Sequence, residues 1–278
     1  MTRPLQESGK GKPLRDHLDT GHAPPSTKQI LRQVKSLEQH LNNLEMIPAI
    51  HLYRNTVVLA LLSKALTVCR AICVLIDAGF HSEAFGLSRT LIEIFFCMRY
   101  ISNKDTETRA ETYVNYSARV RLEWKNVILK HFPQTPPHVL NLDAEVLEKA
   151  KGFKNRAHWT GHGGQAKLMA LEEDTVEVDE QGQPFKSEFD YDALYFWTSQ
   201  FVHATVDGIA GRAGTRGEVF KVRARMYVEK RLGRLSIFNM LVFLCKTFIH
   251  AYRAMNEEQP RALLRMYKMI AKCGLKGP

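Results

Sequence analysis

Apolar residues recur at intervals of three and four along most of this chain, a spacing typical of amphipathic helices. The first stripe consists of five aliphatic residues: Ile30, Val34, Leu37, Leu41 and Leu44. Ser26 and Gln29 precede it at the spacing of a capping box, and Pro48 is expected to end this helix. Residues 1–25 are polar and rich in glycine and proline, which predicts a flexible leader.

The same spacing predicts further helices over seven ranges: about 50–78, 82–102, 105–132, 143–154, 190–209, 218–256 and 261–273. Gly79 should end the first of these, and Ser82 with Glu83 should cap the next. Because the connection between the two is short, we expect them to be antiparallel neighbours. There is no alternation of strands and helices, so the pattern predicts an all-α bundle of long antiparallel helices, a single main domain over 26–278.

Two apolar stretches, 57–80 and 235–252, are interrupted by charged or polar residues: Lys64, Arg70, Asp77, Asn239, Lys246 and His250. We therefore expect no membrane span. The polar N-terminus does not resemble a signal peptide, and a cytoplasmic protein is the simplest expectation.

The five cysteines are odd in number, form no Cys-x-x-Cys motif and have mostly apolar neighbours. This pattern predicts buried thiols in a reducing compartment and neither a metal site nor a cofactor. The sequence also lacks the paired Glu-x-x-His motifs of a di-iron bundle and the glycine-rich loop of nucleoside triphosphatases.

Charge is in excess and unevenly distributed. Lys and Arg total 39 against 29 Asp and Glu, a net charge of +10. Such an excess favours a polyanionic partner, although a basic surface without a specific partner is an equal alternative. Residues 172–189 form an acidic loop, whereas the predicted loop and helix start at 211–234 are basic. The nucleic-acid-binding candidates lie in this basic segment: Arg212, Arg216, Lys221, Arg223 and Arg225.

Arg89 and Glu93 lie four residues apart in an otherwise apolar helix. Burying them unpaired would be costly, so an ion pair is expected. The pair either fixes helix packing or forms the floor of a site in which Arg89 faces a phosphate or an oxyanion.

Two other segments contain side chains that could bind a ligand or transfer a proton. Tyr191, Tyr195, Ser199 and His203 recur every four residues along one face of the helix predicted over 190–209. A histidine there could act as an acid or base near neutral pH, or be structural.

The glycine-rich loop 156–164 contains Arg156, Trp159 and His162. Trp159 could stack on a base as part of a ligand-binding loop, or it could anchor an ordinary loop in the core.

Part of the chain resembles a known family. The residues that carry this resemblance are Gly79, Glu83, Ala84, Leu87, Arg89, Glu93, Tyr100 and Ile101, then Trp159, Gly161, Tyr191, Tyr195, Ser199 and His203. Over about residues 50–210 this layout resembles the all-helical bacterial domain of unknown function 5677 family. That resemblance implies a helical fold and no particular activity.

Arg156 and His162, with five residues between them, match a second pattern. It resembles the Arg-x4–6-His motif of the HEPN superfamily, helical bundles that include metal-independent ribonucleases of toxin and phage-defence systems. In a cleavage of this kind, a base such as His203 would take the 2′-hydroxyl proton and Arg89 or Arg156 would stabilise the phosphorane charge. Tyr195 would orient the imidazole, and Glu93 is a further catalytic candidate.

Two hypotheses follow. In the first, the protein is a non-catalytic helical module of bacterial defence or regulation that binds RNA, another polyanion or a protein partner. In the second, it is a HEPN-like endoribonuclease acting as a toxin or antiphage effector. A homodimer is a further expectation under either hypothesis.

Overall fold

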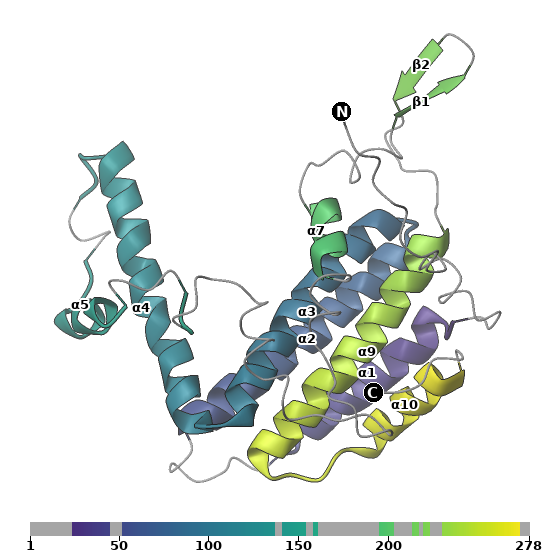
Figure 1. Ribbon diagram of the computed structural model, residues 1–278, viewed down its shortest axis with the longest axis horizontal. Coiled ribbons are helices and arrows are strands. Elements are labelled where there is room, and N and C mark those ends of the chain that lie inside the picture. The colour runs from purple at the N-terminus through teal and green to yellow at the C-terminus, as the bar shows by residue number, and fades with distance from the viewer. Residues whose placement is uncertain are drawn as a thin grey trace, which may run out of the picture.

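The computed structural model describes residues 24–44, 52–136, 141–153, 158–160, 195–202, 213–216, 219–222 and 230–272. Over these residues the fold is an all-α bundle with one small hairpin (Figure 1). The helices are α1 (Thr27–Asn42), α2 (Leu52–Asp77), α3 (His81–Asn103), α4 (Thr106–His131), α5 (Ala144–Lys151), α7 (Phe196–Val202), α9 (Lys230–Met255) and α10 (Arg261–Lys272). The predicted fold class is confirmed.

Helix ends follow local chemistry. The capping box of Ser26 and Gln29 is present at the start of α1, and Gly79 adopts a φ of 82° after α2, which favours glycine. The predicted cap of α3 is wrong. The helix begins at His81, and the hydroxyl of Ser82 lies inside it and donates to Glu83 at 2.6 Å. The tight turn at Gly79 lets the helix begin before Ser82.

The core lies between α2, α3 and α9, and α1 and α10 cover it. The short connection makes α2 and α3 antiparallel, as expected (Figure 1). Helix α9 instead runs parallel to α3. Phe95 of α3 contacts Phe243 of α9, and seven residues later in both helices Ser102 contacts His250. Each helix presents an apolar face at helical spacing, and these faces exclude water together.

Two helices, Tyr53–Asp77 and Leu232–Met255, are long and apolar enough to cross a membrane by length and composition. Of their most apolar windows, 56% and 78% of the residues are buried within the protein. These apolar residues form the contacts of the bundle core. The absence of a membrane span stays a prediction.

The basic segment contains a hairpin where a helix start was predicted. Strand β1 (Ala213–Arg216) pairs antiparallel with β2 (Val219–Val222), and α9 begins only at Lys230. The prediction of a helix from residue 218 is therefore wrong. β-branched and aromatic residues favour strands, and a two-residue separation that includes Gly217 is typical of a tight hairpin.

Helices α4 and α5 form an arm that extends away from the bundle (Figure 1). The base of α4 contacts α2 and α3, and α5 packs against α4. Asp143 caps α5 by accepting a hydrogen bond from the backbone of Val146 at 2.8 Å, at the start predicted for this helix.

Candidate functional site

Helix α7 docks on α3 because Gly86 has no side chain. A Cβ at Gly86 would lie 3.3 Å from the carbonyl carbon of Phe201, closer than most Cβ contacts. The ring of Phe201 meets that of Phe85 edge to face, with centroids 5.1 Å apart. Phe85 belongs to a small apolar cluster with Leu232 and Leu235 of α9. This packing holds α7 against the side of α3 that carries Phe85 and Gly86.

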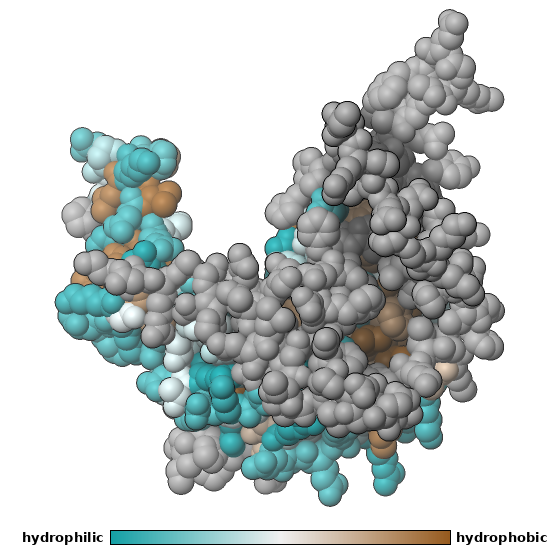
Figure 2. Space-filling view, in the orientation of Figure 1, coloured by the Kyte–Doolittle hydropathy of each residue, from teal (hydrophilic) through white to brown (hydrophobic). Residues whose placement is uncertain are grey.

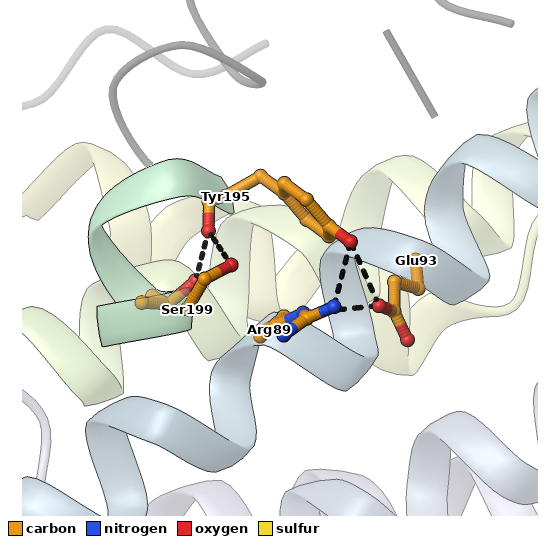
Figure 3. A network of polar contacts seen from close by, with 5 residues as sticks. Arg89, Glu93, Tyr195 and Ser199 are labelled. Atoms are coloured by element: carbon orange, nitrogen blue, oxygen red, sulfur yellow. Dashed lines mark hydrogen bonds and ion pairs between the residues drawn. The ribbon is translucent and has the colours of Figure 1, made fainter. Parts of the chain in front are cut away.

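Tyr195, immediately before α7, closes a network with Arg89 and Glu93 (Figure 3). Arg89 Nη2 donates to the Tyr195 hydroxyl at 2.8 Å, and the hydroxyl donates to Glu93 Oε1 at 3.1 Å. Arg89 Nε also donates to Glu93 Oε1 at 3.1 Å, which confirms the predicted ion pair. The guanidinium carbon lies 4.8 Å from the centroid of the Tyr195 ring, within cation–π range.

Ser199 supports the backbone of the network. Its hydroxyl donates to the carbonyl oxygen of Tyr195 at 2.6 Å, and Thr198 Oγ1 donates to the same oxygen at 3.0 Å (Figure 3). Both side chains are buried, at 9% and 0% exposed. Ser199 therefore fixes the turn that carries Tyr195 and does not extend the polar surface around Arg89. Its predicted ligand-binding role stays a prediction.

The network is partly open to solvent, since the side chains of Arg89 and Glu93 are 21% and 44% exposed. Burial raises the pKa of the Tyr195 phenol, and the Glu93 carboxylate raises it further, while Arg89 acts in the opposite direction. The phenol is thus neutral at physiological pH and bridges the two charged groups. Chemically, the arrangement holds an arginine in a fixed orientation on a partly exposed face.

Trp159 packs away from this network. Its indole is 4% exposed and meets Tyr100 of α3 and Tyr113 of α4 edge to face, at centroid distances of 5.3 and 5.1 Å. This is the alternative in which the tryptophan anchors a loop in the core. The packing leaves little of the indole for a ligand to stack on.

The remaining predicted site residues are not brought to the network by any described contact. Seven of them lie outside the described residues: Arg156, His162, Tyr191, His203, Arg212, Arg223 and Arg225. The leader to residue 23 and the acidic loop 172–189 also lie outside them. Arg216 and Lys221 are on the two strands of the hairpin, where Arg216 pairs with Val219 and Lys221 with Gly214.

A second polar group, which the sequence interpretation missed, lies between α3 and α9. Arg99, Lys246 and His250 are only 3%, 6% and 5% exposed. Ser102 Oγ lies 3.2 Å from His250 Nδ1, and Lys246 Nζ lies 5.3 Å from the Phe95 ring centroid. The signal was present: residues 239, 246 and 250 are polar at intervals of seven and four, one face of a helix. They were interpreted only as interruptions of an apolar stretch.

Among the described residues there is no group of three His, Cys, Asp or Glu side chains that could hold a metal ion. The described cysteines, Cys69, Cys73, Cys97 and Cys245, are free thiols. Burial raises the pKa of each, so these thiols are protonated at neutral pH.

The sequence profile of one protein family, described as a family of unknown function (DUF5677), matches residues 55–219. This range includes α3, α7 and the whole network. No curated protein and no solved structure matches the chain.

Proposed function

The chain belongs to the family of unknown function DUF5677. We propose that it is a non-catalytic helical module that binds RNA in bacterial defence or regulation. Family membership carries no activity, so the proposal is argued from residues. Its main support is the basic hairpin.

The register of the hairpin supports binding to a phosphate backbone. Gly214 pairs with Lys221 and Arg216 with Val219, so by the two-residue period of strands these four positions share one face. Ala213, Thr215, Phe220 and Val222 share the other face. The positions of both basic residues, Arg216 and Lys221, thus lie on the same face of the hairpin. Further arginines flank both strands in the sequence: Arg212, Arg223 and Arg225.

The network on α3 favours recognition over catalysis. Arg89, Glu93 and Tyr195 are bonded to one another, and the raised pKa of Tyr195 keeps its phenol from acting as a base at neutral pH. An arginine held in one orientation suits a phosphate, because its planar donors bind two oxygens at once. Arg89 would thus add a specific contact to the sequence-independent contacts of the hairpin.

The experiment is fluorescence polarisation of a labelled single-stranded RNA across a range of salt concentrations, with DNA of the same sequence for comparison. The variant Arg216→Gln/Lys221→Gln should bind more weakly. If both residues contact phosphates, the slope of log K against log salt should become shallower by about 1.4. The matched control, Lys28→Gln/Lys64→Gln, removes the same charge from exposed positions on α1 and α2 and should keep the wild-type slope.

Equal slopes and affinities for both double variants would overturn the role of the hairpin, and tighter binding of DNA would overturn RNA as the ligand. The RNA from the same mixtures, with EDTA present, is then run on a denaturing gel. Intact RNA is expected. Cleavage that His203→Ala abolishes would support the ribonuclease hypothesis instead.

A further inference from the structure

The free half of the α4 arm carries an exposed apolar stripe. Val120, Trp124 and Val127 are 51%, 56% and 54% exposed. Their intervals of four and three place them on one side of the helix, and Ala118 and Leu122, which are better buried, lie on the opposite side. Figure 2 shows apolar surface on this part of the arm.

Single exposed aliphatic residues are ordinary, but an aligned stripe with a tryptophan at its centre is typical of a contact surface. Phe132, just beyond the helix, is 64% exposed and extends the same apolar end of the arm. Because the arm extends from the bundle (Figure 1), another helix could reach this side of α4 without displacing the described helices.

We propose that this stripe is the interface of a homodimer, in which α4 of a second copy lies antiparallel against it. With the two-fold axis near residues 125 and 126, Trp124 packs against the partner's Val127 and Val120 lies opposite the partner's His131. Both contacts occur twice, as a two-fold interface requires. The intervals of four and three are those of an interhelical seam.

Charge complementarity selects a second copy in this orientation. Glu123 and Lys130 flank the stripe at equivalent positions, and both are exposed. The antiparallel register brings Glu123 beside the partner's Lys130, and Lys130 beside the partner's Glu123. In a parallel pair Glu123 and the partner's Lys130 would lie on opposite sides of the seam and would not meet. Glu123 also accepts from Arg119 of its own helix at 2.7 Å, which orients the carboxylate along this side of α4.

The interface is short, which sets its strength. Residues 120–131 span about 18 Å of helix. Two such faces bury at most about the 1,000 Å² that marks the lower limit for a specific interface. The dimer is therefore a weak one, with a dissociation constant in the micromolar range.

The experiment is sedimentation velocity of the full chain from about 1 to about 200 µM. The wild type should pass from monomer to dimer over this range, and Trp124→Glu should remain monomeric. Val74→Glu is the matched control, because Val74 is also an exposed apolar helix residue, at 63%, but lies on α2. It should dimerise as the wild type does.

A charge exchange tests the register. Glu123→Lys and Lys130→Glu should each raise the dissociation constant about tenfold, because two attractive pairs become repulsive. Mixing the two variants should restore dimers, since the lysine introduced at position 123 of one variant then meets the glutamate introduced at position 130 of the other. Single variants that dimerise as well as the wild type would overturn the antiparallel register.

A wild type that is monomeric throughout would overturn the dimer. Loss of RNA or vesicle binding in Trp124→Glu, with a monomeric wild type, would instead assign the stripe to that ligand. The hairpin variants keep this stripe intact, so failure of RNA binding and failure of dimerisation are distinguishable.

Discussion

Removing one hydroxyl group, in Tyr195→Phe, tests whether the polar network joins α7 to α3. The hydroxyl accepts from Arg89 at 2.8 Å and donates to Glu93 at 3.1 Å. Phenylalanine removes both interhelical bonds and keeps the ring, which lies 4.8 Å from the guanidinium carbon. The ion pair between Arg89 and Glu93 lies within α3 and should persist.

The expected loss follows from the exposure of the partners. A hydrogen bond to a charged group contributes about 1.5–3 kcal/mol, and two such bonds are lost. However, Arg89 and Glu93 are 21% and 44% exposed, so water replaces much of the lost hydroxyl. We expect the free energy of unfolding to fall by about 1–2 kcal/mol. For a domain of this size that corresponds to a Tm lower by about 4 °C.

The assays are thermal and urea unfolding followed by far-ultraviolet circular dichroism, with hydrogen exchange of the α7 amides. Exchange should accelerate in α7 more than in α2 or α9, because the lost bonds hold α7 locally. Tyr113→Phe is the matched control. Its ring packs against Trp159, and among the described residues its hydroxyl has no hydrogen bond in the structure, so its stability should change by less than about 0.5 kcal/mol.

A double-mutant cycle with Arg89→Gln gives the sharpest refutation. If the two side chains are in contact, Tyr195→Phe should cost about 1 kcal/mol less in the Arg89→Gln background. Strictly additive losses, or equal stability of Tyr195→Phe and Tyr113→Phe, would refute the direct bond.

Two further predictions concern buried groups. The Tyr252 hydroxyl is buried and, within the described part of the chain, has no hydrogen-bond partner, so Tyr252→Phe should leave the urea midpoint unchanged or raise it; a loss above about 1 kcal/mol would contradict this. Burial raises the pKa of Cys73 and Cys97 to about 12, with smaller effects of Asp77 and Glu93 respectively. Unfolded thiols titrate at about 8.5, so the stability these thiols contribute is fully present below that pH and is lost as pH rises towards 12. Urea midpoints should therefore fall above about pH 9, and less steeply in Cys97→Ala; a rising midpoint would contradict the sign.

The helices and their ends were largely predictable from the sequence. Helical periodicity and caps are local, so the stripe after Ser26 and the turn at Gly79 are sufficient to place α1 and the end of α2. The hairpin was missed because its strands are only four residues long, too short for a period-two pattern to stand out.

The ion pair of the candidate site was also predictable, because Arg89 and Glu93 are one helical turn apart. Its third member was not. Tyr195 lies 106 residues from Arg89, and the two meet only because Gly86 lets the backbone of Phe201 approach α3. Likewise, the sequence shows that residues 246 and 250 share a helix face, but only the parallel packing of α9 on α3 buries them beside Ser102 and Phe95. Periodicity determines which side of a helix is apolar, whereas the choice of neighbour depends on the fit of whole surfaces from distant segments.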